Sequence, residues 1–329
     1  VASVSAVKAL AAKGDIDVNI WPKSATGQLK ADKKALEIFE GEDSTHNSPL
    51  VAAHRVVANS EKVLGYVSKV VENAGPTGRM HPEIKILGAS ATGRMAASKP
   101  EIQQFPDDAR GVIMADDEQW VSCDWSSIEP VVLATASGDG LFLEEMRAGG
   151  DPYEPVGKLA GVDRKLAKRK MLADMYGQGA KAAALQYGWS IERAKEVSWK
   201  IRQGLPILYQ LIDALKEQSK TTGRVTTLTG RVLDQRIEFY EGGVKITDVA
   251  DRIAPNHFCQ GSALDVMHHT ILELDRRGLS DHVHLWMHDE VVVDACITEE
   301  VMEVMRTPPP FLQAVADHHC IEPFLAVDR

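Results

Sequence analysis

Two acidic segments, far apart in the chain, each place a carboxylate at the end of a β-type run. Asp124 ends the run 120–124, and Asp289 follows the run 282–287 with Glu290 directly after it. Carboxylate oxygens are the hard ligands that Mg²⁺ prefers, and a pair of such ions can activate a hydroxyl and neutralise the charge of phosphoryl transfer. We therefore predict that Asp124 and Asp289 bind two Mg²⁺ ions, with Glu290 as an auxiliary acidic group. The alternative for each Asp alone is a turn or cap residue.

A helical stripe of mixed chemistry lies between the two acidic segments. Arg164, Lys168, Leu172 and Tyr176 follow one another at intervals of four residues, so a helix would carry them on one slowly drifting face. The two cations suit a triphosphate and the two larger side chains suit a base. A solvated basic face is the alternative for this stripe. Together with the carboxylates, the stripe indicates nucleotidyl transfer.

The bulk composition is that of a globular protein. A chain of 329 residues is longer than one hydrophobic core usually organises, so several lobes are predicted. With 44% hydrophobic and 26% charged residues, the composition does not indicate extended disorder. No run reaches the roughly 18 apolar residues of a membrane span. The four cysteines are widely separated with no Cys-x-x-Cys pair, which favours a reducing, cytoplasmic setting. The chain begins at Val1 without a secretory signal, and we expect a processed or excised fragment.

The formal net charge of −10 argues against a nucleic-acid partner, because phosphate contacts need lysine and arginine. The segment 164–170 overrides that average locally. It supplies five cations, namely Arg164, Lys165, Lys168, Arg169 and Lys170. We therefore expect an uneven charge distribution, as a binding cleft requires.

Hydrophobic periodicity and turn residues predict the elements that must hold these groups. Helices are expected over 60–72, 128–136, 164–176, 191–203, 207–220 and 255–274, with a last helix after 308–310. Three pairs of strands are expected. Strands 112–114 and 120–124 form a hairpin about the acidic turn 115–118, and strands 225–228 and 232–233 flank a turn at Gly230. Strands 282–287 and 290–297 are joined by a turn that contains His288 and Asp289. Pro130 requires a place in the first turn of its helix, whereas Pro255 is expected to kink its own.

Four motifs, in order, resemble the polymerase region of a family A DNA polymerase, the DNA polymerase I type, in a phage-like member. They are Ala91-Thr92-Gly93-Arg94 with Pro100 and Gln103; Asp124 to Glu129; Arg164, Lys168, Leu172 and Tyr176-Gly177; and His288-Asp289-Glu290. Each motif alone is weak, but the ordered set is specific. The resemblance covers about residue 20 to the C-terminus.

The resemblance implies an α+β fold of right-hand architecture, with an antiparallel-sheet palm, helical fingers and a partial helical thumb. The implied division is a partial thumb over 1–80, a first part of the palm over 81–138, fingers over 139–250 and a second part of the palm over 251–329. Neither a 3′→5′ exonuclease domain nor a 5′ nuclease is visible in this chain.

The resemblance also implies an activity: template-directed addition of deoxynucleotides to a primer 3′-hydroxyl, with primer-template DNA and dNTPs as partners and no membrane. By resemblance, Arg164 and Lys168 bind the triphosphate, Lys168 serves as general acid, Tyr176 lies near the templating base and Glu129 is the gate against a 2′-hydroxyl. The remaining implied residues face DNA: Arg94, Gln103, Arg252, Asn256, Gln260 and His288. Arg252, Asn256 and Gln260 are spaced by four, so we expect one polar stripe that tests minor-groove acceptors; a plain polar face is the alternative.

Two positions depart from the family pattern. Leu172 stands where cellular members carry an aromatic residue, and Tyr153 stands where they often carry histidine. An aliphatic side chain cannot stack on a base or sugar, so we expect Leu172 to tune nucleotide selection.

Two other functions stay open from the sequence: a single-subunit RNA polymerase, against which Glu129 and the length speak, and a non-catalytic DNA-binding fragment of a polymerase. The expected location is the cytoplasm of a bacterial or phage-infected host cell. Processivity or replisome partners are not identified by the sequence.

Overall fold

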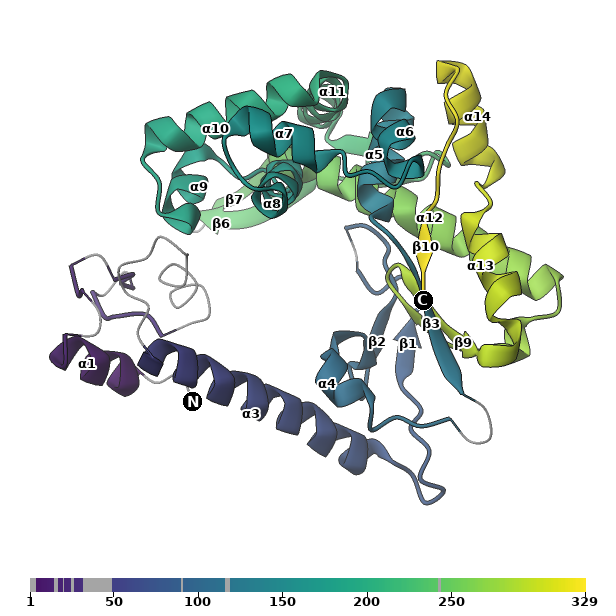
Figure 1. The fold of residues 1–329 in the computed structure, drawn as a ribbon, viewed down its shortest axis with the longest axis horizontal. Helices are drawn as coiled ribbons and strands as arrows, with labels where there is room; N and C mark the ends of the chain where they lie inside the picture. Colours follow the sequence, from purple (N-terminus) through teal and green to yellow (C-terminus); the bar gives the residue numbers. More distant parts are fainter. Residues whose placement is uncertain are drawn as a thin grey trace. The chain divides into compact units, whose positions relative to one another are not determined.

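The computed structural model describes residues 4–14, 17–19, 21–24, 27–31, 49–89, 91–115, 119–241 and 244–329. The chain divides into two compact units (Figure 1). The first unit comprises the described residues of Val1–Pro82, Lys99–Ile113 and Gly179–Lys195, and the second those of Glu83–Ser98, Met114–Gln178 and Glu196–Arg329.

The first unit is mainly helical. Its elements are α1 (Val4–Ala12), α3 (Pro49–Asn73), the 3₁₀ turn η1 (Ile102–Gln104), α4 (Asp107–Arg110), α9 (Ala180–Tyr187) and the beginning of α10 (Ile191–Gly204). The predicted helix 60–72 is confirmed and is part of the longer α3. The ring of Tyr66 on α3 lies 4.8 Å from that of Phe105, and Lys69 donates to Glu101 at 2.6 Å. These contacts fix α3 on the segment that precedes α4.

The second unit is built around a four-stranded antiparallel sheet in the order β10-β3-β9-β8. The strands are β3 (Trp120–Trp125), β8 (Val283–Met287), β9 (Glu290–Asp294) and β10 (Val327–Asp328). Helix α13 (Thr298–Arg306) packs on β3, where the indole of Trp125 donates to the carbonyl of Met305 at 2.8 Å. Helix α5 (Ile128–Ser137) is almost fully buried and packs on α12 (Ala254–Arg276). The predicted palm-type antiparallel sheet is confirmed.

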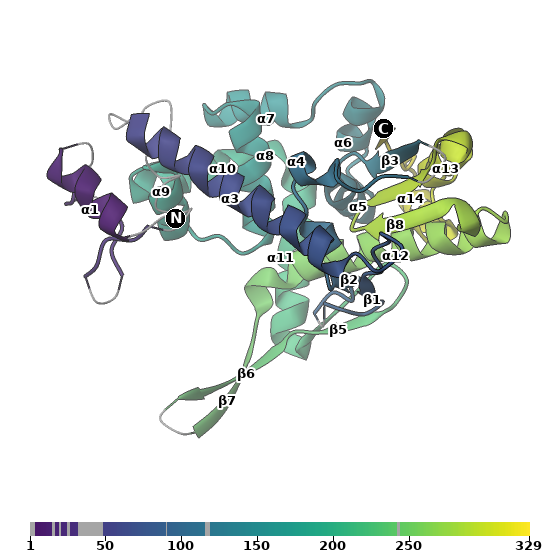
Figure 2. The same ribbon diagram turned by 90° about the horizontal axis from the view of Figure 1, so that it is seen from below.

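The rest of the second unit consists of helices and two-stranded ribbons. The elements are β1 (Glu83–Lys85), β2 (Ala96–Ser98), α6 (Gly140–Arg147), α7 (Tyr153–Ala160), α8 (Arg164–Met175), the remainder of α10, α11 (Pro206–Thr222), β4 (Arg224–Thr226), β5 (Val232–Asp234), β6 (Arg236–Glu241), β7 (Val244–Val249), η2 (Asp251–Ile253), η3 (Ser280–His282), η4 (Ala295–Ile297) and α14 (Pro310–His319). Figure 2 shows the β6–β7 ribbon extending away from the helices of this unit. The helices expected over 164–176, 191–203 and 207–220 are confirmed as α8, α10 and α11.

The hairpin expected between 112–114 and 120–124 is wrong. Residues 112–114 form no strand, and both edges of β3 are taken by β9 and β10. The physical reason is that pairing with two strands from the C-terminal part of the chain buries Cys123 and Trp125, whereas the short run 112–114 leaves Met114 81% exposed. The acidic residues 116–118 of the expected turn lie outside the described residues.

Lys170 is not part of the basic surface that the sequence suggested. Its side chain is 0% exposed and pairs with Asp174 one turn later on α8. Asp174 also accepts a hydrogen bond from the hydroxyl of Tyr209 on α11, at 2.8 Å. Lys170 therefore anchors α8 to α11 and is not available to phosphate.

Replacing Asp174 with alanine is expected to lower the free energy of unfolding by about 3–5 kcal/mol, because it leaves the Lys170 ammonium buried without a counter-charge. Denaturant unfolding would measure this change. Asp213→Ala is the control: it breaks the ion pair with Arg202, whose two side chains are 41% and 50% exposed, and such a pair contributes about 0–1 kcal/mol. Equal stabilities of the two variants would contradict the assignment.

Within the described part of the chain, no helix combines the length and the hydropathy needed to cross a bilayer.

Candidate active site

The two acidic segments meet on neighbouring strands of the four-stranded sheet. Cys123 and Trp125 of β3 are buried, so the alternation of the strand turns Asp124 to the other, exposed face. Asp124 stands opposite Glu290 in the β3–β9 register, and the amide of Trp125 donates to the carbonyl of Asp289 at 3.0 Å. The fold therefore brings Asp124, Asp289 and Glu290 to one end of the sheet.

Asp289 is held by a tight turn. Met287 pairs with Glu290 in the β8–β9 ladder, which leaves only His288 and Asp289 in the connection. His288 has a φ of 52°, in the left-handed region that two-residue hairpin turns require. Burial lowers the pKa of His288, and Arg94 lowers it further, against the opposing effect of Asp289 and Glu290. A neutral imidazole beside the carboxylates follows.

Glu290 faces the same side of the sheet as Asp124, because residues opposite each other in a ladder share a face. Its side chain is nearly buried and accepts a hydrogen bond from the hydroxyl of Ser122. Among the described residues, no group of three histidine, cysteine or acidic side chains is arranged to hold a metal. The oxygen donors of Asp124 and Asp289 nevertheless fit Mg²⁺, which takes one or two protein carboxylates and completes its shell with water and phosphate.

Glu129, for which a gate role was predicted, lies in the first turn of α5. Ser127 precedes the helix with a left-handed φ of 61°, and Pro130 occupies the first turn, as the sequence required. Arg94 donates to the Glu129 carboxylate, and the two side chains are 22% and 17% exposed. Burial raises the pKa of Glu129, Arg94 opposes that rise, and Asp289 adds to it. Glu129, Arg94 and Asp289 are thus close enough to interact.

Helix α8 carries the two cations toward the same region. Asp163 caps the helix by accepting from the amide of Leu166. Lys168 donates to the hydroxyl of Ser127 at 2.8 Å and lies 5.7 Å from the ring centre of Tyr153. Burial lowers the pKa of Lys168, and the neighbouring Arg164 lowers it further. Lys168 is therefore positioned directly beside the turn that follows Asp124.

Arg164 is held by an acidic partner. It donates to one oxygen of Asp151, whose other oxygen accepts from the amide of Tyr153, the first residue of α7, at 2.9 Å. Tyr153, which was expected to depart from the family pattern, has a hydroxyl that is buried without a hydrogen-bond partner. Burial raises the pKa of this hydroxyl, so Tyr153 stays neutral. Its ring supports Lys168, and its hydroxyl offers no charge to a phosphate.

The C-terminal end of α8 places Tyr176 against α12. Tyr176 is 48% exposed, and its hydroxyl accepts from the side-chain amide of Gln260 at 2.7 Å. Burial raises the pKa of Tyr176, and Glu129 raises it further. Leu172 lies one turn before Tyr176 and is partly buried. Four predicted site residues, Arg94, Glu129, Tyr176 and Gln260, therefore converge near Asp289.

The single stripe expected for Arg252, Asn256 and Gln260 is wrong. Helix α12 begins at Ala254 with Pro255 in its first turn, so the proline starts the helix and does not kink it. Arg252 precedes the helix in η2, and Asn256 is 5% exposed with its carbonyl oxygen unpartnered. Only Gln260 of the three meets the other candidate residues. Roles of Arg252 and Asn256 at DNA stay predictions.

Arg252 has a packing role. A Cβ at Gly177 would lie 2.8 Å from the Cβ of Arg252 and 2.9 Å from its carbonyl oxygen, so glycine after Tyr176 permits this close approach. Gln103 lies in η1 of the first unit, and its contact with DNA stays a prediction.

Residues 7–316 match the family model described as DNA polymerase family A. The chain belongs to DNA polymerase family A. It is 28% identical to DNA polymerase I of Aquifex aeolicus over 86% of this chain and 49% of that protein, and 27% identical to the DNA polymerase of Mycobacterium phage L5 over 87% of this chain and 46% of that protein. The chain thus spans about half the length of these relatives.

A solved polymerase domain has the same fold. The POL domain of Pol1 from M. smegmatis, in complex with DNA primer-template and dNTP, superposes with a TM-score of 0.71 at 20% identity, over 93% of this chain and 56% of that one. This likeness confirms the α+β polymerase architecture inferred from the four motifs.

Two further residues of this family A site were not found from the sequence. Ser127 and Asp151 bind Lys168 and Arg164 respectively. For Asp151 a signal existed, since Asp-Pro directly before a helical run is typical of an N-terminal cap. For Ser127 no signal existed, because its left-handed conformation is set by the junction of β3 with α5.

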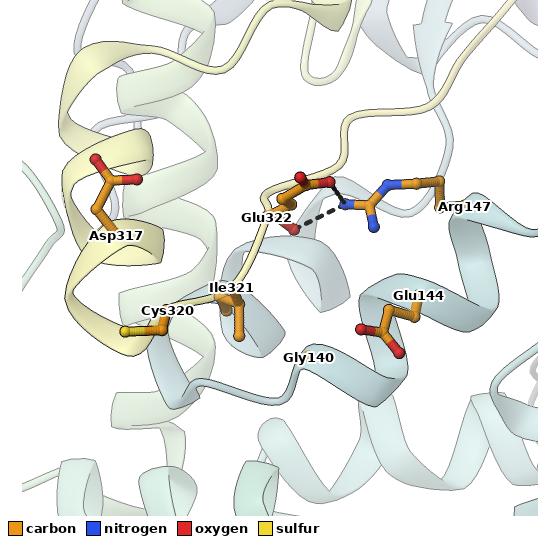
Figure 3. Close-up of a pocket in the computed structure, with 7 residues that line it drawn as sticks. All are labelled: Gly140, Glu144, Arg147, Asp317, Cys320, Ile321 and Glu322. Atoms are coloured by element: carbon orange, nitrogen blue, oxygen red, sulfur yellow. Dashed lines mark hydrogen bonds and ion pairs between the residues drawn. The ribbon is translucent and has the colours of Figure 1, made fainter.

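A pocket of about 600 Å³ lies elsewhere in the second unit, between α6 and the segment after α14 (Figure 3). Arg147 points across it and donates to the carbonyl of Glu322 at 3.0 Å. None of the candidate site residues lines this pocket, so it belongs to a different part of the unit.

Proposed function

We propose that this chain catalyses template-directed addition of deoxynucleotides to a primer 3′-hydroxyl, with primer-template DNA and dNTPs as its partners. The observation that carries the proposal is the meeting of Asp124 and Asp289 on β3 and the β8–β9 turn, within a family A fold. The proposed division is a partial thumb over 1–80, a palm over 81–138 and 251–329, and fingers over 139–250. The proposed location is the interior of a bacterial or phage-infected cell.

Asp124 and Asp289 are the residues that would hold two Mg²⁺ ions, with Glu290 as the auxiliary group kept in place by Ser122. Bound there, the ions would lower the pKa of the primer hydroxyl and neutralise charge on the transferred phosphate. Asp124 lies on the exposed face of β3, and Asp289 lies in the turn between β8 and β9.

The cations of α8 bind the triphosphate in this proposal. The 3′-hydroxyl loses its proton to solvent water, and the bond from the 3′-oxygen to the α-phosphorus forms while the bond from the α-phosphorus to the pyrophosphate oxygen breaks. Lys168 gives its proton to the leaving pyrophosphate, and its lowered pKa makes this transfer easier. Arg164 exchanges its contact with Asp151 for a phosphate, which can accept from the planar guanidinium at two oxygens.

The remaining candidate residues surround the new base pair. Glu129 occupies the position that excludes a ribose 2′-hydroxyl, and Tyr176 lies beside the templating base. The DNA-facing set in the proposal is Arg94, Gln103, Arg252, Asn256, Gln260 and His288. Arg94 and Gln260 are the best supported, because each contacts a nucleotide-site residue, Glu129 and Tyr176 respectively.

One assay separates the proposal from its rivals. Primed and unprimed templates are offered deoxynucleotides or ribonucleotides with Mg²⁺, and DNA binding is followed in parallel. Primed, deoxy-specific extension is the expected result. RNA synthesis without a primer would indicate a single-subunit RNA polymerase, and binding without extension would indicate a non-catalytic fragment.

Replacing Leu172 with phenylalanine is expected to lower the KM for dNTPs by up to about tenfold. An aromatic ring at this position can stack on the incoming nucleotide, and such contacts contribute about 0.5–1.5 kcal/mol. Single-nucleotide extension kinetics measure KM and kcat for dNTPs and dideoxynucleotides. Leu166→Phe, on the same helix but off the stripe, is the control. An unchanged KM in Leu172→Phe would contradict a nucleotide-facing role.

A further inference from the structure

Arg231, in the loop between β4 and β5, joins three segments of the second unit. Its Nε donates to the carboxylate of Asp265 at 3.0 Å, one terminal nitrogen donates to the carbonyl of Thr92 at 2.8 Å, and the other donates to the carbonyl of Gly261 at 2.8 Å. Asp265 is itself fixed by the hydroxyl of Thr229 at 2.7 Å. The guanidinium thus binds α12 and the Ala91–Arg94 loop at once.

Two glycines make this close approach possible. Gly93 has a φ of +81°, and a Cβ there would lie 2.7 Å from a terminal nitrogen of Arg231. A Cβ at Gly261 would lie 2.8 Å from Thr227 and 2.9 Å from Leu233, which flank Arg231. Gly93 therefore leaves room for the guanidinium, and Gly261 leaves room for the side chains of Thr227 and Leu233, so a larger side chain at either position would displace a neighbour.

The carbonyl that Arg231 holds belongs to the loop that presents Arg94. Thr92 is 4% exposed, and the amide of Gly93 and the carbonyl of Arg94 both hydrogen-bond to Ala89, at 2.6 and 2.9 Å. Arg94 leaves this turn to reach Glu129. Because Arg231 links the Thr92 carbonyl to α12, the backbone that carries the Arg94 side chain is held in one position relative to α12.

The other carbonyl belongs to the helix that presents Gln260. Gly261 follows Gln260 directly, and Gln260 donates to the hydroxyl of Tyr176. Arg231 therefore sits between the two side chains best supported as minor-groove contacts, Arg94 and Gln260, yet it touches neither the gate Glu129 nor the carboxylates of the sheet.

We propose that Arg231 is a positioning residue, which fixes the spacing of Arg94 and Gln260 so that a mismatched primer terminus is rejected. The inference rests on the proposed polymerase function. Minor-groove acceptors occupy equivalent places in all correct pairs, so two donors at a fixed spacing recognise correct geometry and not sequence. When the distance between Arg94 and Gln260 is no longer fixed by Arg231, the two donors contact matched and mismatched primer termini equally well.

The test is a double-mutant cycle with Arg231→Lys and Arg94→Ala. Lysine keeps a charge beside Asp265 but cannot reach both carbonyls, because it lacks the planar fork. Arg231→Lys is expected to lower kcat/KM for a matched primer by about 10- to 100-fold. It should lower extension of a mismatched primer much less and leave the KM for dNTPs unchanged. In the Arg94→Ala background the same substitution should have little further effect.

Arg236→Lys is the matched control, since it alters another arginine–aspartate pair, with Asp234, whose side chains are about half exposed. It should leave matched and mismatched extension as in the wild type. Two results would overturn the inference: equal losses from Arg231→Lys with and without Arg94, or equal losses on matched and mismatched primers.

The same four proteins of the double-mutant cycle can be compared by DNA binding, without primer extension. Fluorescence anisotropy gives the affinity of each variant for matched and mismatched primer-template, and Arg231→Lys should reduce the preference for the matched duplex only when Arg94 is present. A wild-type protein that binds with this preference but never extends would refute the proposed catalysis and leave the role of Arg231 intact. A preference that persists in Arg231→Lys would refute the positioning role alone.

Discussion

Asp289→Asn is expected to reduce primer extension by on the order of 10³-fold or more, because metal stabilisation of the transferred phosphate contributes several kcal/mol. The amide keeps the size of the side chain and the β8–β9 turn but loses the anionic oxygen. Asp124→Asn is expected to have the same effect. Single-turnover extension on a primed template measures both.

The control for this loss is Asp281→Asn, an exposed aspartate in η3 just before β8. It should extend primers normally. Unfolding curves and DNA affinity of Asp289→Asn should stay close to those of the wild type, since the sheet register is made by backbone groups. Normal extension by Asp289→Asn would refute the assignment of this carboxylate.

Lys168→Met is expected to lower kcat by about 10²–10⁴-fold, the range for loss of a general acid. Methionine preserves the packing against Tyr153 but has no proton to give. Quenched-flow measurement of the extension step separates this loss from a change in dNTP affinity.

The pH profile gives the second readout for Lys168. A general acid must be protonated, and burial together with Arg164 lowers the pKa of Lys168, so the wild-type rate should fall as pH rises through that lowered value. Lys168→Arg retains a charge that does not titrate in this range, so its residual rate should lack this alkaline limb. An unchanged limb in Lys168→Arg would show that another group donates the proton.

Much of the site was predictable from local patterns. The alternation of side chains along β3 predicted that Asp124 and Cys123 lie on opposite faces of the strand, and the two-residue connection predicted that Asp289 lies in a turn. Both predictions agree with the structure. Arg164, Lys168 and Leu172 also follow one another on a single helix, because α8 is continuous from Arg164 to Met175, and Tyr176 directly follows its last residue. In each case one uninterrupted element decides where the side chains point.

The errors arose where an element boundary or a distant partner decides the geometry. Arg252 shares a spacing of four with Asn256 and Gln260, but α12 starts only at Ala254, so Arg252 lies outside the helix. Asn256 lies inside the helix but is only 5% exposed. Lys170 belongs to the basic run by sequence, yet its direction on α8 takes it to Asp174 and Tyr209. Periodicity carries no information about such partners.

Two features of the fold could not be predicted from local sequence patterns. The β6–β7 ribbon was not predicted, although Arg236–Glu241 and Val244–Val249 pair in full register. The hydrogen bonds from Arg231 to the carbonyls of Thr92 and Gly261 join segments far apart in the chain, so only the folded structure could reveal them.

The most direct test of the central claim is whether Asp124 and Asp289 hold the same metal. Fe²⁺ can replace Mg²⁺ in the complex with a dideoxy-terminated primer-template and a matched dNTP, and hydroxyl radicals formed at the bound ion cleave the backbone nearby. Cleavage is predicted near both residue 124 and residue 289, and either Asp→Asn substitution should abolish both cuts together. Cleavage at one segment only, or at neither, would contradict a shared metal site.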